Sequence, residues 1–206
     1  PLVCPELMCH GIEEASELKP LLARATVVAL GPGLGQDAWA RALLAVVLAS
    51  PLPLVVDADG LNLLAGESLR RSDWILTPHP GEMAALTGLD KDAIQADRLK
   101  LALSYAKEWG QIVVLKGAFT VIASPDGRAT LIPVASSALA HAGTGDVLAG
   151  LITGLRAQGV GAYDAAVAGA WIHAQAGLFA AEKIGSETSV MAGDVLDCVA
   201  EVLSGF

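Results

Sequence analysis

The chain has 206 residues, of which 53% are hydrophobic and 17% charged, and its 13 basic and 22 acidic residues give a formal net charge of −9. This composition excludes a disordered or linker protein and predicts one domain with a substantial core. The acidic balance, with no cluster of Lys or Arg, argues against nucleic acid and anionic membranes as partners. The longest apolar stretches are too short or too interrupted to span a bilayer.

The three cysteines, Cys4, Cys9 and Cys198, are an odd number and include no CxxC pair. This argues against a disulfide framework and against a zinc knuckle, and it favours a reducing compartment. The first residues contain two prolines and no basic region, so they do not resemble a signal peptide. We therefore expect a cytoplasmic protein.

Apolar runs alternate with longer helical patterns in the first half of the chain. Strands are predicted at residues 26–30, 53–56, 74–76 and 112–115. Helices are predicted at residues 37–48, after the third strand up to about residue 86, and at residues 91–109. The strand runs are continuously apolar rather than alternating, which is typical of a parallel sheet covered on both faces. Crossover helices between such strands predict an α/β sandwich.

The pattern changes after Lys116. Residues 119–123 and 129–133 flank Ser-Pro-Asp-Gly at 124–127, which predicts an antiparallel pair. The remainder is predicted to be helical at residues 146–158, 163–183 and 190–203. Residues 1–206 are expected to form one domain. Because the sequence begins with Pro-Leu-Val and has no initiator Met, we expect it to be the later part of a longer domain.

Four unusual segments follow the four predicted parallel strands: GPGLG, DADGLN, TPHPGE and KGAFT. In open α/β sheets, ligands bind outside the carboxyl ends of the strands. The coincidence across four strands therefore predicts a site at this edge. In the first segment, the amides around Gly33 and Gly35 could approach a phosphate or a sugar closely. The alternative is a tight turn from strand to helix.

Carboxylates and one histidine stand in the next two segments. Asp57, together with Asp59 and Asn62, could hold Mg²⁺ with waters, or Asp59 or Asn62 could cap a short helix beginning near residue 61. Two prolines stiffen the loop around His79 and keep it out of a helix interior. Its place after a strand end favours a ligand-binding role for the imidazole, and the alternative is a structural histidine. Glu82 is favoured in the first turn of a helix, or it could orient a metal-bound water.

The segment Ala-Gly-Thr-Gly-Asp at residues 142–146 is the most specific signal. Unpaired amides at the start of a helix form an anion hole, and the helix dipole adds to it. Beside such a hole, the Asp146 carboxylate could take a proton from a hydroxyl while the amides hold a transferring phosphoryl group. The alternative is that Asp146 serves only the start of its own helix.

Together, GPGLG, VVDADGLNLLA, ILTPHPGEMAALTG, VLKGAFT and AGTGDVLAGLI resemble the motifs of the ribokinase-like superfamily, and within it the ADP/ATP-dependent NAD(P)H-hydrate dehydratases, in order and spacing over essentially the whole chain. The resemblance implies a ribokinase-like three-layer sandwich with a mainly parallel sheet, flanking helices and an antiparallel hairpin. It also implies a lyase that uses ADP or ATP and Mg²⁺ to convert NAD(P)H hydrate to NAD(P)H.

The resemblance implies roles for individual residues. Asp146 would be the catalytic base and face the substrate hydroxyl. Gly33, Gly35 and His79 would contact the hydrated dinucleotide. The nucleotide would lie against Lys116, Gly117, Ala118, Phe119, Thr120, Gly143, Thr144 and Gly145. Glu82 and Asp57 are the candidate metal ligands. The chain departs from the family at Ser136-Ser137, where Asn-Pro is common, and at His141, where a small residue is common.

The family also has an earlier βαβ portion that supplies one wall of the substrate site, and this sequence does not contain it. We expect its absence to leave an apolar flank near residues 26–30, and therefore a homo-oligomer or another chain covering that flank. An NAD(P)H-hydrate epimerase is the expected functional companion. Two other functions stay open: a ribokinase-like kinase of a small vitamin-precursor alcohol, and a nucleotide-binding module without catalysis.

Overall fold

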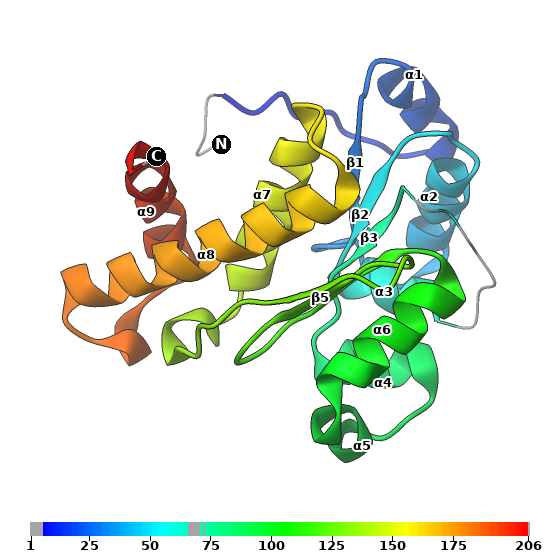
Figure 1. The fold of residues 1–206 in the computed structure, drawn as a ribbon. Coiled ribbons are helices and arrows are strands. Elements are labelled where there is room, and N and C mark those ends of the chain that lie inside the picture. Colours follow the sequence, from blue (N-terminus) through cyan, green and yellow to red (C-terminus); the bar gives the residue numbers. More distant parts are fainter. Residues whose placement is uncertain (1–5, 66–70, 72, 206) are drawn as a thin grey trace.

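Six strands form one sheet in which each strand lies beside the next strand along the chain (Figure 1). The computed structural model describes residues 6–65, 71 and 73–205. The first four strands are parallel, and the last two run antiparallel to their neighbours. The strands are β1 (Val28–Leu30), β2 (Leu54–Val56), β3 (Ile75–Leu76), β4 (Ile112–Leu115), β5 (Val121–Ala123) and β6 (Ala129–Leu131). The mainly parallel sheet with one antiparallel hairpin is confirmed.

Helices cover both faces of this sheet. They are α1 (Lys19–Leu22), α2 (Ala38–Leu48), α3 (Ala58–Leu64), α4 (Pro80–Thr87), α5 (Lys91–Ala96), α6 (Arg98–Trp109), α7 (Thr144–Ala157), α8 (Ala162–Ile184) and α9 (Ala192–Ser204). Short 3₁₀ turns lie at Ala15–Leu18, Ser137–Leu139 and Glu187–Ser189. No helix in the part of the chain that the structure describes combines the length and the hydropathy that a membrane crossing needs.

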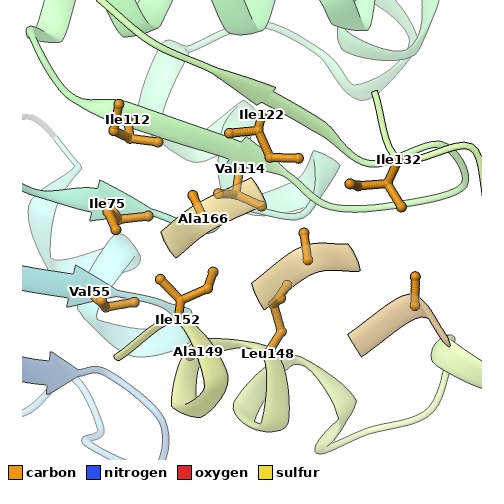
Figure 2. Packing of buried hydrophobic residues seen from close by; sticks show 12 residues of the cluster. Val55, Ile75, Ile112, Val114, Ile122, Ile132, Leu148, Ala149, Ile152 and Ala166 are labelled. Atoms are coloured by element: carbon orange, nitrogen blue, oxygen red, sulfur yellow. The ribbon is translucent and has the colours of Figure 1, made fainter. Parts of the chain in front are cut away.

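The continuously apolar strands divide their side chains between two cores. Val55, Ile75 and Val114 point to one face, where they pack against α7 and α8 (Figure 2). Leu54 and Val56 lie on the other face with α2 and α3, and Val113 and Leu115 lie there with α4, α5 and α6. Helix α9 packs against α8 on the outer side. This is the three-layer sandwich that the sequence predicted, with all four residues of β4 buried.

One predicted helix is wrong. Residues 91–109 do not form one helix, because the backbone breaks at Asp97, which has φ −148° and ψ 65°. The Asp97 side chain then accepts a hydrogen bond from the amide of Lys100 and begins α6. Asp is a favoured residue at a helix start and competes with helix continuation through such side-chain bonds. The break places Arg98 at the first position of α6.

The hairpin is shorter than predicted. β5 begins at Val121 rather than at Phe119, because Phe119 has φ +55° and Gly117 has φ +142°, neither of which is strand geometry. β4 therefore turns back through a loop at residues 116–120 (the Lys116–Thr120 loop). The predicted turn at residues 124–127 is present: Gly127 donates to the Ser124 carbonyl, and Ser124 donates to the Arg128 carbonyl.

Candidate active site

The Gly-rich loop after β1 packs tightly against the segment after β2. A Cβ added at Gly31 would lie 1.7 Å from the Asp57 carbonyl oxygen, so only glycine fits at this position. Asp59 Oδ2 accepts a hydrogen bond from the Gly35 amide at 2.9 Å, and Asp59 Oδ1 accepts one from Gln36. Asp59 therefore holds the Gly-rich loop in place, a role that the sequence analysis missed. Gly33 and Gly35 remain exposed on the outer side of this loop.

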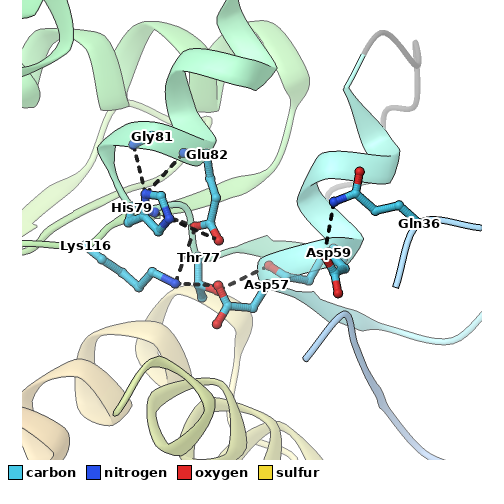
Figure 3. Close-up of polar contacts among 9 residues, drawn as sticks. Gln36, Asp57, Asp59, Thr77, His79, Gly81, Glu82 and Lys116 are labelled. Atoms are coloured by element: carbon cyan, nitrogen blue, oxygen red, sulfur yellow. Dashed lines mark hydrogen bonds and ion pairs between the residues drawn. The ribbon is translucent and has the colours of Figure 1, made fainter. Parts of the chain in front are cut away.

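Lys116, just after β4, lies between two buried carboxylates, one directly after β2 and one in the first turn of α4 (Figure 3). Its Nζ lies 2.5 Å from Asp57 Oδ1 and 3.5 Å from Glu82 Oε2. The side chains of Asp57 and Glu82 are 2% and 8% exposed, and that of Lys116 is 17% exposed. Buried charges persist in a fold only when they are paired in this way. The structure thus unites Lys116 with both candidate metal ligands.

His79 begins α4 and caps it. Its Nδ1 accepts hydrogen bonds from the amides of Gly81 at 2.9 Å and Glu82 at 3.2 Å, while Glu82 Oε2 accepts one from the His79 amide at 2.7 Å (Figure 3). Because Nδ1 is an acceptor, the neutral imidazole carries its proton on Nε2. The side chain is 56% exposed and Nε2 lies 3.6 Å from Glu82 Oε1. The cap occupies one edge of the ring, and the other edge is open to a ligand.

The glycine-rich segment at residues 142–146 starts α7 as predicted. Gly143 is the N-cap with φ +87°, and no side chain caps the helix. Thr144 is buried, and its hydroxyl donates toward the carbonyls of Leu139 and His141, 2.8 Å from each. The Thr144 amide also donates to the His141 carbonyl, at 3.3 Å. Thr144 therefore fixes the turn, while the amides of Gly143 and Gly145, which have no acceptor among the described residues, are left as an anion hole.

Asp146 lies in the first turn of α7 and is exposed. Among the described residues its carboxylate has no hydrogen-bond or ion-pair partner, so it makes no capping bond. Its position still benefits from the helix dipole, which favours a negative charge in the first turn. The carboxylate is thus accessible and available to accept a proton.

His173, on α8, lies behind the anion hole and was not predicted. It is 7% exposed, its Nε2 is buried without a hydrogen-bond partner among the described residues, and its ring faces the backbone of Thr144. Burial, together with the positive charge of Lys116, lowers the pKa of His173 to about 4, although the neighbouring backbone of Thr144 opposes the shift. His173 is therefore neutral at pH 7. No sequence pattern links residues 144 and 173, so only the packing of α7 on α8 reveals the contact.

The end of β4 and the start of α7 meet. A Cβ added at Gly145 would lie 3.4 Å from Lys116 Nζ and 3.5 Å from Asp57 Oδ2. A cavity of about 130 Å³ opens beside them, lined in part by Lys116, Gly117, Ala118, Thr120 and His173. Four of the five residues predicted in the Lys116–Thr120 loop line this cavity. Phe119 does not, and it is 49% exposed.

The carboxylates at this site suit an Mg²⁺ ion only if a bound ligand supplies part of its coordination shell. Over the described residues, no group of three or more Asp, Glu, His or Cys side chains could hold a metal ion. Mg²⁺ commonly uses one or two carboxylates together with waters and substrate phosphates. Asp57 and Glu82 fit that arrangement in their chemistry, although both already contact Lys116.

Comparison with known proteins assigns the family. The family model described as NAD(P)H-hydrate dehydratase matches residues 2–199. The chain belongs to this family. It is 45% identical over 191 residues to the bifunctional NAD(P)H-hydrate repair enzyme Nnr of Coxiella burnetii, a match that covers 93% of this chain and 39% of that protein. This member of the NAD(P)H-hydrate dehydratase family thus spans about two fifths of the length of this curated relative.

Two further matches are named for the dehydratase reaction. The ADP-dependent (S)-NAD(P)H-hydrate dehydratase of Neisseria meningitidis is 36% identical over 93% of this chain and 66% of its own length. The ADP/ATP-dependent NAD(P)H-hydrate dehydratase of Bacillus subtilis, crystallised with ATP/Mg²⁺, superposes with a TM-score of 0.80 at 30% identity, covering 90% of this chain and 70% of that one. The predicted family and its ribokinase-like fold are confirmed.

Proposed function

We propose that this chain forms the dehydratase domain that converts (S)-NAD(P)H hydrate to NAD(P)H at the expense of ADP or ATP. The observation that carries the proposal is the free, exposed Asp146 carboxylate beside the unpaired amides of α7, which lie against Lys116. A proton acceptor next to an anion hole is the arrangement that phosphoryl transfer to a hydroxyl requires. Family membership, and relatives named for this reaction, support the substrate and the nucleotide.

The reaction proceeds in two steps. Asp146 accepts the proton of the ring hydroxyl as that oxygen bonds to the terminal phosphorus of the nucleotide, and the bond from phosphorus to the bridging oxygen breaks. The amides of Gly143 and Gly145 stabilise the charge on the transferred group, while the Thr144 amide donates to the His141 carbonyl. The ring nitrogen lone pair then expels the phosphate, and loss of a ring proton restores NAD(P)H. The products are NAD(P)H, phosphate and AMP from ADP, or ADP from ATP.

The other proposed contacts follow the loops at the same sheet edge. Gly33, Gly35 and the open edge of His79 bind the hydrated dinucleotide, and residues 116–120 bind the nucleotide phosphates. Bound Mg²⁺ supplies positive charge to those phosphates, with Asp57 and Glu82 as the protein carboxylates that would hold it. Lys116 adds a protein-borne charge at the same point.

We also propose that the complete domain includes a βαβ portion beyond these 206 residues. β1 pairs only with β2 within the described residues, so its other edge is open to a further strand. The relatives' greater length supports this proposal. The isolated chain is then expected to associate with itself, which size-exclusion chromatography with light scattering tests. We further propose that the protein acts in the cytoplasm together with an NAD(P)H-hydrate epimerase. Cys9 and Cys198 are free cysteines, and Cys4 lies outside the described residues.

The decisive experiment measures recovery of NADH absorbance from its hydrate with ADP and with ATP, on the full-length protein. The dehydratase releases NADH and phosphate in equal amounts. The alternative, a kinase of a small alcohol, yields a phosphorylated alcohol and no NADH. Nucleotide affinity without either product would identify a binding module without catalysis.

A further inference from the structure

Three backbone carbonyls, from the end of β4 and from the loop that follows it, converge on the guanidinium group of Arg98. Arg98 Nη2 donates to the carbonyls of Leu115 at 2.8 Å and Lys116 at 3.1 Å, and Nη1 donates to the carbonyl of Ala118. These carbonyls span the end of β4 and the first half of the Lys116–Thr120 loop. Arg98 itself comes from a different element, at the first position of α6.

The position is unfavourable for a cation in two ways. The N-terminus of a helix carries a partial positive charge, which repels a guanidinium in the first turn. Partial burial also lowers the pKa of Arg98, and its Nε is buried without a hydrogen-bond partner among the described residues. The hydrogen bonds to the three carbonyls offset both costs, because hydrogen bonds from a charged donor are stronger than those between neutral groups.

Glycine at position 117 permits this contact. A Cβ added at Gly117, which has φ +142°, would lie 3.1 Å from Arg98 Nη2, so the glycine lets the guanidinium approach. In a trans peptide the N–H points opposite to the C=O. With the Lys116 carbonyl on Arg98, the Gly117 amide therefore faces away from the guanidinium, and no described residue accepts a hydrogen bond from it. That amide is free to donate to an anionic ligand.

We propose that Arg98 is a positioning residue that holds the Lys116–Thr120 loop, with its Gly117 amide free, in the shape that receives nucleotide phosphates. The proposal rests on the nucleotide-binding role proposed above for this loop. Arg98 does not touch the reacting atoms in this role. It acts through the carbonyls that it binds, and a change at Arg98 should therefore alter nucleotide affinity through the loop.

Arg71 provides a matched control. Its guanidinium also donates to three carbonyls of one loop, those of Ser50, Pro51 and Leu52, at 2.6, 2.7 and 3.3 Å. This loop precedes β2, at the amino end of the strand, whereas the Lys116–Thr120 loop follows the carboxyl end of β4. The two arginines thus make the same kind of contact with loops at opposite ends of the sheet, and only one of these loops is proposed to bind nucleotide.

Calorimetry with ADP/Mg²⁺ and ATP/Mg²⁺ on the full-length protein tests this proposal in the wild type, Arg98→Ala, Arg98→Lys and Arg71→Ala, with melting temperatures recorded in parallel. Arg98→Ala should raise the nucleotide Kd about tenfold, the worth of one lost charge-assisted hydrogen bond. Millimolar guanidinium chloride should restore most of that affinity in Arg98→Ala and change nothing in the wild type. Arg71→Ala should lower the melting temperature and keep the wild-type Kd.

Arg98→Lys keeps the charge but cannot span three carbonyls. If Arg98→Ala does not fold, Arg98→Lys gives the answer: a raised Kd and faster hydrogen exchange at the Gly117 amide support the proposal. An unchanged Kd in the folded Arg98 variants overturns it, and so does an Arg71→Ala variant that loses as much affinity. A wild type that binds neither nucleotide refutes the proposed function and this inference together, whereas tight wild-type binding with an unchanged Arg98 variant refutes this inference alone.

Discussion

The two ends of the parallel strands carry different chemistry on the same backbone. At the amino end, the Arg71–Asp73 pair is about one third exposed, and Arg71 ties down a loop that contains no ionisable residue. At the carboxyl end, Asp57 and Glu82 are almost fully buried around Lys116. Buried charges are costly unless they are paired, and clusters of buried ionisable groups are common at functional sites. This difference supports the proposed site at the carboxyl end.

Glycines at the two ends of the strands also differ in how closely they are packed. Gly88 and Gly110 end α4 and α6 in the left-handed conformation, and a Cβ added at either would meet no atom within 4 Å. They supply the left-handed residue that commonly ends a helix. Gly31 and Gly117, at the carboxyl end, have φ values of +130° and +142° and close neighbours as well. Glycine is needed there for space as much as for conformation.

The largest expected effect concerns Asp146. Asp146→Asn should keep the melting temperature and the nucleotide Kd, because the side chain is exposed and makes no capping bond. Losing the proton acceptor should lower turnover on the order of 10²–10⁴-fold. NADH recovery, melting temperature and calorimetry on the full-length protein check this. Asp126→Asn, on the exposed hairpin turn, is the control and should retain wild-type turnover. An Asp146→Asn variant within a few-fold of wild type would mean that another group takes the proton.

Two glycine substitutions sharpen the contrast between the two ends. Gly88→Ala should lower the free energy of unfolding by about 1–2 kcal/mol, the cost of the left-handed conformation alone. Gly31→Ala should cost more than about 4 kcal/mol or prevent folding, because its Cβ would overlap the Asp57 carbonyl. Urea unfolding of both variants measures the difference. Equal losses would show that the two loops are not packed as described.

A pH titration of stability tests the buried imidazole. The pKa of His173 is about 4 in the folded chain, below its ordinary value near 6.5, so the unfolded chain binds the proton first. The free energy of unfolding should be highest above pH 6.5 and fall toward pH 4, by at most about 1.4 kcal/mol per pH unit. Urea unfolding across this range measures the slope. His173→Phe should flatten that part of the profile, and a slope that survives the substitution would assign it to other groups.

The smallest expected effect separates the two edges of the His79 ring. His79→Ala should destabilise the chain by about 1 kcal/mol through loss of the α4 cap, whereas His79→Asn should keep the cap. Both variants should weaken binding of the hydrated dinucleotide and leave nucleotide affinity unchanged, because both lack Nε2. Melting temperature and separate calorimetric titrations check this. Binding of the hydrate by His79→Asn at wild-type strength would limit His79 to the cap.

The sequence predicts those features that depend on residues close to one another along the chain. The run Ile-Val-Val-Leu of β4 has no polar position, so burial on both faces followed directly. The His79 cap could also have been found, because Pro at the first helical position and Glu at the third are typical of helix starts. The break at Asp97 could not, since helix-forming residues continue on both sides of it. The contacts of Arg98 and His173 join distant segments and exist only after packing.

The order of the strands in the sheet has a consequence for synthesis on the ribosome. Because each strand pairs with the next one along the chain, the sheet can grow as residues emerge, with no early strand waiting for a distant partner. The buried charges of the proposed site, in contrast, come from segments that are far apart in the sequence. Asp57 and Glu82 are made before Lys116, and α7 is made later still. A nascent chain that ends before Lys116 has both carboxylates without their cation, so closure of the site is expected to be a late event in folding.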